Sequence, residues 1–275
     1  MLGFYLILKA IILGIVEGLT EFLPVSSTGH LILFGNLLDF RGAFATSFQV
    51  MIQLGAILAI VVLYRERIIG AFKNLGKEQW GRGLAINVIV GVLPAFVLAL
   101  IFSDVIKSFF GSVYIVAVSL IVGAVLLYIA ERYTKGKKAE SRKDSLESLT
   151  VKDSLVVGLF QCLAMVPGMS RSGSTISGGL FRNLSPRLAA EFSFFLAIPI
   201  MMGAFVFELN ELVIGSTIEV AALVVGFVVS FIVAYFVVKI FVEFLGKHSY
   251  VGFVIYRAIV GVVLLVLIWS GMING

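Results

Sequence analysis

Residues 17–30 read EGLTEFLPVSSTGH and residues 161–175 read QCLAMVPGMSRSGST, and these two polar segments interrupt an otherwise apolar chain. They lie 144 residues apart and correspond in pattern, with Ser26 aligned with Ser170. Each contains proline, glycine and several hydroxyls, and together they hold two glutamates, a histidine and an arginine. Ionisable residues are costly inside a bilayer and usually mark a functional site. We therefore expect the chemistry of this protein at the two polar segments.

The composition of the chain places it in a membrane. Of its 275 residues, 60% are hydrophobic and only 13% are charged, which excludes an ordinary soluble domain. The first apolar run, 2–16, is too short to span comfortably and runs into Glu17 without a cleavage site, so we expect it in the mature protein. Six other runs have the length of a transmembrane helix: 47–64, 86–102, 113–130, 190–208, 217–240 and 250–272.

The net charge of +5 is distributed as in a membrane protein rather than a nucleic-acid-binding protein. Loops 65–85 and 131–152 are strongly basic, whereas 103–112 and 209–216 contain a single lysine between them. The positive-inside rule places the two basic loops in the cytoplasm. We expect a multi-pass protein of the membrane with no nucleic-acid partner.

The two halves of the chain resemble each other beyond the polar segments. The sequence predicts one all-α membrane domain in which repeats 1–133 and 151–275 are joined by a cytoplasmic linker, 134–150. Each repeat contains a re-entrant broken-helix hairpin, 2–38 or 153–184, followed by three full spans. Because an odd number of crossings inverts the second repeat, this is an inverted-topology repeat with about six full transmembrane helices. Both termini are then extracytoplasmic.

The glycine content has a further implication for assembly. The chain holds 28 glycines, and small residues in membrane helices allow close packing between them. We expect such packing within the chain and also at an interface between two copies, a homodimer.

The first polar segment holds candidate metal ligands and a candidate base. Glu17 and Glu21 are four residues apart and share a helix face, where like charges repel unless a cation lies between them. Carboxylates beside hydroxyls, here those of Ser26 and Ser27, suit Mg²⁺ or Ca²⁺, and His30 is a candidate base. The alternative is structural, with hydrogen-bonded glutamates and Ser26 or Ser27 as a helix N-cap.

The second polar segment has the features of an anion site. Gly168 lets the backbone approach a ligand, and free amides at a helix start bind anions. Arg171 provides a planar fork that binds phosphate oxygens in a bidentate manner. The alternative is that Arg171 pairs with a carboxylate such as Glu191 to close a helix break. The hydroxyls expected at the phosphate are those of Ser170, Ser172 and Thr175, together with that of Ser26 in the first segment, whereas Ser174 and Ser177 are expected to be helix caps.

Two other polar positions within spans have structural interpretations. Gln53 is predicted to form an interhelical hydrogen bond. Arg257 is predicted to pair with a carboxylate or to extend its charged end to the membrane surface.

At these residues the chain resembles the bacterial undecaprenyl pyrophosphate phosphatase family of the bacitracin-resistance type. The family motif (E/Q)xxxE is matched at 17–21, the motif PGxSRSxxT is matched at 167–175, and the family histidine corresponds to His30. The resemblance covers the full chain. It implies an enzyme of the bacterial cytoplasmic membrane that removes the terminal phosphate of a long polyprenyl diphosphate lipid. That reaction regenerates the lipid carrier for cell-wall synthesis and gives bacitracin resistance.

The predicted mechanism places the diphosphate between the two polar segments. Glu17 and Glu21 hold a divalent cation, Arg171 stabilises charge on the transferred group, and the hydroxyls donate hydrogen bonds. Three nucleophiles stay open: a water activated by His30 or a glutamate, the hydroxyl of Ser27, or His30 itself.

A single site is expected, because Gln161 and Met165 in the second repeat replace the glutamates of the first. The alternative from another class of protein is a secondary transporter or lipid flippase, which would use the same inverted repeat.

Overall fold

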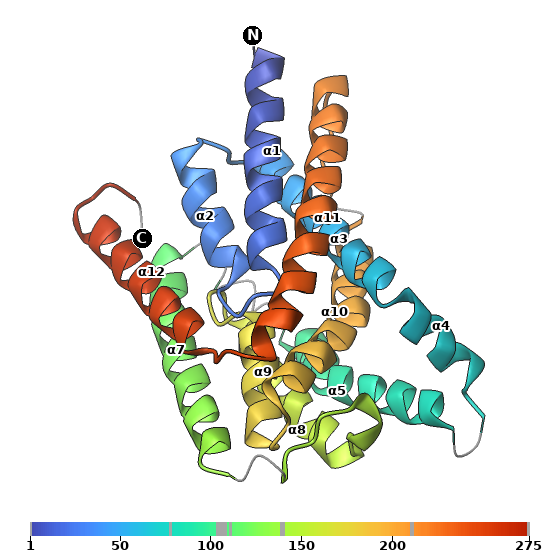
Figure 1. Ribbon diagram of the computed structural model, residues 1–275. Helices are drawn as coiled ribbons and strands as arrows, with labels where there is room; N and C mark the ends of the chain where they lie inside the picture. Colours follow the sequence, from blue (N-terminus) through green and yellow to red (C-terminus); the bar gives the residue numbers. More distant parts are fainter. Residues whose placement is uncertain are drawn as a thin grey trace.

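The computed structural model of the protein (Figure 1) describes residues 2–76, 79–102, 109, 112–137, 141–209 and 212–273. Within these ranges every regular element is helical, which confirms the predicted all-α class. Three lysines that contribute to the charge asymmetry of the loops, Lys77, Lys107 and Lys138, lie outside the described residues.

Seven of the described helices are long and apolar enough to cross a membrane, judged by length and composition. They are α1 (Leu2–Thr20), α3 (Ala43–Leu63), α5 (Trp80–Ile101), α7 (Val113–Lys135), α10 (Pro186–Glu208), α11 (Thr217–Leu245) and α12 (Val251–Trp269). The last six correspond to the six predicted spans.

Helix α1 reaches the length of a span although its apolar run, 2–16, is too short by itself. The helix continues through Glu17, as the predicted shared helix face of Glu17 and Glu21 requires, and ends at Thr20. The hydroxyl of Thr20 donates to the carbonyl oxygen of Val16 at 2.7 Å, so the polar side chain is satisfied within the helix itself. The extra turn brings α1 to the length of a span.

Two polar breaks separate pairs of helices. The first break lies between α1 and α2 (Ser27–Leu37), and the second lies between α8 (Val151–Gln161) and α9 (Arg171–Phe181). A 3₁₀ turn, η3 (Cys162–Met165), extends α8 into its break. Helices α2 and α9 are both 11 residues long and begin 144 residues apart. A further helix, α4 (Arg65–Lys73), and a 3₁₀ turn, η2 (Leu146–Ser148), lie in the basic loops.

Each break ends in a serine with the same unusual backbone conformation. Ser26 and Ser170 both have φ of 70°, in a region that few residues other than glycine adopt. Each serine side chain caps the following helix by accepting a hydrogen bond from the amide of Gly29 or Gly173. The cap that was predicted at Ser26 or Ser27 is therefore Ser26.

Close packing of α11 against α1 and α3 depends on small residues. A Cβ atom at Gly14 would lie 2.7 Å from the carbonyl oxygen of Gly226, and one at Gly18 would lie 2.8 Å from that of Ser230. No larger side chain fits such contacts, so the glycines let the helix backbones approach. Close packing is thus confirmed within the chain, while the homodimer stays a prediction.

The arrangement of the helices brings the two breaks into the interior. In Figure 1, α1 and α2 occupy one end of the molecule and α8 and α9 occupy the other. The hydroxyl of Ser172 at the start of α9 donates to the carbonyl oxygen of Leu23 in the first break at 2.8 Å. The polar residues of both breaks therefore meet between the two ends.

Candidate active site

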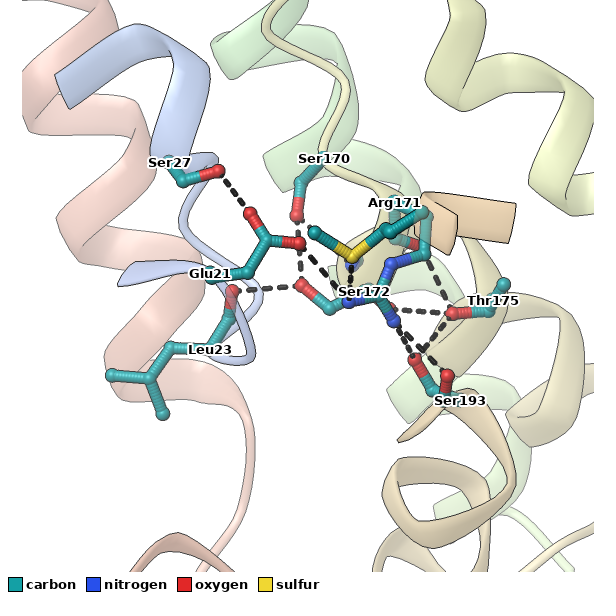
Figure 2. Close-up of polar contacts among 10 residues, drawn as sticks. Glu21, Leu23, Ser27, Ser170, Arg171, Ser172, Thr175 and Ser193 are labelled. Carbon is teal, nitrogen blue, oxygen red and sulfur yellow. Dashed lines mark hydrogen bonds and ion pairs between the residues drawn. The ribbon is translucent and has the colours of Figure 1, made fainter. Parts of the chain in front are cut away.

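An ion pair between the two breaks forms the centre of the site. Arg171 Nη2 lies 3.1 Å from Glu21 Oε1, and the two side chains are only 11% and 7% exposed. Figure 2 shows the guanidinium reaching across from α9 to the carboxylate. The pairing with Glu191 that the sequence left open is wrong, because Glu191 accepts from Arg187 at 3.0 Å instead. The ion pair joins residues that are 150 positions apart in the chain.

The other terminal nitrogen of the Arg171 guanidinium bonds to helix α10. Arg171 Nη1 donates to both the carbonyl oxygen and the hydroxyl of Ser193, each at 3.0 Å. The same Ser193 hydroxyl is 2.7 Å from the hydroxyl of Thr175. The sequence analysis missed Ser193, and the signal that could have identified it is a lone serine in the apolar run FSFFLAI at 192–198.

Ser27 lies on the opposite side of the Glu21 carboxylate. Its hydroxyl donates to Glu21 Oε2 at 2.5 Å, as Figure 2 shows. A nucleophilic hydroxyl needs a base within hydrogen-bond reach, and the Glu21 carboxylate is at that distance from the Ser27 hydroxyl. Glu21 therefore connects a candidate nucleophile to the guanidinium of Arg171.

Glu17 is fully buried and lacks hydrogen-bond donors. Neither of its carboxylate oxygens has a partner among the described residues, and the charged groups of Glu21 and Arg171 are its electrostatic neighbours. A buried carboxylate of this kind needs a proton or a cation. Magnesium is usually held by one or two carboxylates together with phosphate oxygens, so this pair of glutamates fits such an ion. The described residues contain no cluster of three acidic, histidine or cysteine side chains for an all-protein metal cage.

A cavity of about 510 Å³ opens beside the ion pair. One wall is polar and combines both breaks; of the predicted site residues it holds Glu21, Ser26, Ser27, Gly168, Ser170 and Arg171, with Thr28 beside them. The rest is mostly apolar and comes from α5 and α10, including Val92, Ala95, Phe96, Leu100, Pro199, Ile200 and Met201. The cavity thus offers a charged pocket that continues into an apolar one.

Two predicted phosphate ligands do not line the cavity. Ser172 donates to the first break, and Thr175 donates to Ser193, so both connect structural elements of the site. The prediction that Ser174 and Ser177 are helix caps is also wrong. Ser177 donates to the carbonyl oxygen of Gly173, and Ser174 has no hydrogen-bond partner among the described residues. Ser170 caps α9 in their place.

His30 does not line the cavity; it lies on α2 and contacts α12. Its Nδ1 is 2.8 Å from the carbonyl oxygen of Ser26, and its Nε2 is 2.7 Å from the hydroxyl of Tyr256. Because a carbonyl only accepts, Nδ1 carries the proton and Nε2 accepts from the tyrosine. Both ring nitrogens are therefore engaged in holding the first break.

Two glutamines complete the cavity wall. Gln53 of α3, for which an interhelical hydrogen bond is predicted, lines the cavity, and so does Gln161 at the end of α8. Gln161 Nε2 donates to the carbonyl oxygen of Gly91 at 3.2 Å, which attaches the second break to α5.

Comparison with known proteins gives consistent matches over almost the whole chain. Residues 10–263 match the family described as bacitracin resistance protein BacA. A protein of Albidiferax ferrireducens named undecaprenyl-diphosphatase is 43% identical over 270 residues, which cover 98% of both chains. Proteins of the same name from Acinetobacter baumannii and Thermoanaerobacter sp. are each 46% identical, over 94% and 96% of this chain and 95% and 97% of theirs.

Proposed function

The chain belongs to the bacitracin resistance protein BacA family, and from that premise we propose how its two polar breaks perform the reaction. The protein is a membrane enzyme that dephosphorylates undecaprenyl diphosphate, a polyprenyl diphosphate lipid, to the monophosphate. This activity suits the recycling of a lipid carrier for cell-wall synthesis and resistance to bacitracin. The transporter alternative is not favoured, because the relatives are named as phosphatases.

One observation supports the mechanism most strongly. The Glu21 carboxylate lies between the Ser27 hydroxyl at 2.5 Å and the Arg171 guanidinium at 3.1 Å, and all three residues line the cavity. A nucleophile, its base and a cation for the phosphate are thereby placed at one wall. Of the three nucleophiles considered, this geometry favours Ser27, since both nitrogens of His30 are engaged elsewhere.

In the proposed reaction the Ser27 oxygen attacks the terminal phosphorus while its proton passes to Glu21. The bond from that phosphorus to the bridging oxygen breaks, and undecaprenyl monophosphate leaves. Water then attacks the phosphoserine, which releases inorganic phosphate and returns a proton to the serine. Arg171 stabilises the charge on the transferred phosphoryl group in both steps. Ser26, Ser170 and the backbone at Gly168 bind its oxygens from the polar wall.

We propose that Glu17 and Glu21 hold Mg²⁺ or Ca²⁺ together with the diphosphate. When bound, the ion neutralises charge on the phosphate oxygens. The paired burial of the two carboxylates and the lack of a donor to Glu17 support this assignment.

We propose an inverted-topology repeat with two re-entrant hairpins, one formed by α1 and α2 and the other by α8 and α9. The equal lengths of α2 and α9, their offset of 144 residues and the matching φ of Ser26 and Ser170 support a common origin of the hairpins. Their positions at opposite ends of the molecule support the inversion (Figure 1).

The proposed topology also places the cavity in one half of the membrane. The cavity is lined by residues 92–100 of α5 and 199–204 of α10, in the halves of these helices that lie far from the basic loops. Phe96 and Leu100 are 54% and 63% exposed, which supports a lateral opening into the extracytoplasmic half of the bilayer. A cysteine placed at exposed Leu75 tests this orientation. A reagent that cannot cross the membrane should label this cysteine only when it is added on the cytoplasmic side.

Phosphate release from undecaprenyl diphosphate by the purified protein in detergent tests the mechanism. We expect turnover that a chelator abolishes and that Mg²⁺ or Ca²⁺ restores. Ser27→Ala should lower kcat at least ~1,000-fold, because it removes the nucleophile. Ser270→Ala, at an exposed serine beyond α12, is the control. A Ser27→Ala variant that turns over like the control would show that Ser27 is not the nucleophile.

A further inference from the structure

Arg257 is a fully buried arginine that the mechanism above does not use. It lies on α12, and its side chain is 0% exposed. Its Nη1 donates to the carbonyl oxygen of Pro24 at 3.3 Å. Its Nη2 donates to the carbonyl oxygens of Gly168 at 3.2 Å and Met169 at 2.9 Å. One guanidinium thus binds backbone oxygens of both breaks.

The charge of Arg257 has no carboxylate partner among the described residues, contrary to the sequence-based expectation. Nor does the side chain extend to the membrane surface, because it is fully buried. A buried cation is costly, and its hydrogen bonds to three carbonyl oxygens offset only part of that cost. Such a residue is hard to explain by stability alone.

Two glycines make room for the guanidinium. A Cβ atom at Gly123 of α7 would lie 2.0 Å from Nη2, and one at Gly173 of α9 would lie 2.4 Å from Nη1. These distances are far below any van der Waals contact, so each alanine would displace the guanidinium. The guanidinium of Arg257 therefore lies between two glycines, Gly123 and Gly173, whose lack of a side chain leaves space for it.

The bound carbonyl groups lie at the strained parts of the breaks. Met169 directly precedes Ser170, which has φ of 70°, and Pro24 lies two residues before Ser26, which has the same φ. Strained backbone of this kind persists only where the surroundings hold it. The neighbouring Tyr256 holds the first break as well, through His30 and the carbonyl oxygen of Ser26.

We propose that Arg257 is a positioning residue for the dephosphorylation. By joining the two breaks it sets the distance between Ser27 and Glu21 on one side and Arg171 on the other. The inference rests on the proposed function, since it concerns the same site. It makes α12, which contributes no residue to the cavity wall, part of the catalytic apparatus.

Steady-state kinetics of two variants test the proposal. Arg257→Lys keeps the charge but cannot direct bonds to three oxygens, and Gly123→Ala displaces the guanidinium without changing Arg257. Both should lower kcat by about 10- to 100-fold with KM within about threefold of wild type, because the phosphate ligands remain but are misaligned. Gly123→Ala should still fold, since alanine favours a helix and the closest atom that its Cβ meets, Arg257 Nη2, ends a flexible side chain, while the carbonyl oxygen of Met169 at 3.1 Å must shift by only a few tenths of an ångström.

Two matched controls separate positioning from stability. Arg182→Lys alters an arginine that bonds to Asp153 at 2.9 Å at the other end of α9, and it should lower the thermal midpoint without changing kcat. Gly252→Ala on α12, where a Cβ meets no atom within 4 Å, should change neither. The proposal fails if Arg257→Lys and Gly123→Ala keep kcat within threefold of wild type, or raise KM alone. An inactive wild-type protein would overturn the proposed function itself.

Discussion

Glu21 is the residue on which the charges of the site converge. It accepts a hydrogen bond from Ser27 and forms an ion pair with Arg171, while the Glu17 carboxylate lies nearby. Arg171 also lies on the cavity wall, so under the proposed mechanism a bound phosphate would contact its guanidinium.

Ser193 determines how Arg171 points. The Ser193→Ala variant should lower kcat about tenfold, because it removes one hydrogen bond to the guanidinium and leaves the bond to the carbonyl oxygen. Arg171 then keeps its charge and loses part of its orientation. Kinetics of the purified variant check this, with Ser47→Ala on α3 as a control for a buried serine outside the site. An unchanged kcat would show that Glu21 and the carbonyl oxygen of residue 193 are sufficient to orient Arg171.

At the scale of residues, the sequence predicts which chemical groups form the site better than it predicts which groups contact each other. The types of group at the site follow from polar residues in apolar surroundings and from the two motifs. Their partners do not, because Glu21 and Arg171 are 150 residues apart and either could pair locally. Ser193 was missed because a single serine within an apolar helix has many structural explanations.

At the scale of elements, the ends of the short helices hold the breaks in place. Helix α8 begins with a capping box in which Thr150 and Asp153 bond reciprocally. Asp153 is fully buried and also bonds to Lys143 and to Arg182 at 2.9 Å. One carboxylate therefore fastens α8, α9 and the linker 134–150 to each other.

The pKa of Asp153 gives a pH dependence of stability. Burial raises the pKa of this carboxyl, but hydrogen bonds from Lys143, Thr150 and Arg182 outweigh it and lower the pKa to about 2. Because the folded-state pKa lies below the ordinary value of 3.8, the stabilisation is complete above about pH 4 and is lost as the pH falls towards 2. It amounts to about 1–2 kcal/mol once screening of the partly exposed cations is allowed for.

Thermal unfolding in detergent between pH 5 and pH 2 measures this effect. Asp153→Asn should lower the midpoint at pH 5 and flatten its decline in acid, since the titrating group is gone. An equal decline in the variant and the wild-type protein would assign the acid sensitivity to other carboxylates.

Hydrophobicity predicts the presence of the membrane helices but not the residues at which each helix begins and ends. The six interior spans are predicted correctly, because long apolar runs allow one interpretation. Helix α1 is longer than its apolar run 2–16, since a helix can pass through Glu17 and Thr20 when their side chains are buried or satisfied within the protein. Hydropathy values do not include burial or hydrogen bonds of individual polar side chains, so they cannot predict that the helix continues through these residues.

At the scale of the whole molecule, the fold brings two dissimilar breaks together at one cavity. The first polar segment contributes carboxylates and the proposed nucleophile, and the second contributes the Arg171 guanidinium and a capped helix start. The sequence indicates this division, because only one segment is acidic. It could not indicate that α12 joins the breaks, since Arg257 is remote from both in the chain.

A double-mutant cycle on kcat/KM tests most directly that the two breaks form one site. Glu21→Gln and Arg171→Lys are measured singly and together on undecaprenyl diphosphate. Because the two side chains are in contact at 3.1 Å, the combined loss should be at least tenfold smaller than the product of the single losses, a coupling of about 1.4 kcal/mol or more. Losses that multiply to within twofold would show that the two segments act independently, and would contradict a shared site.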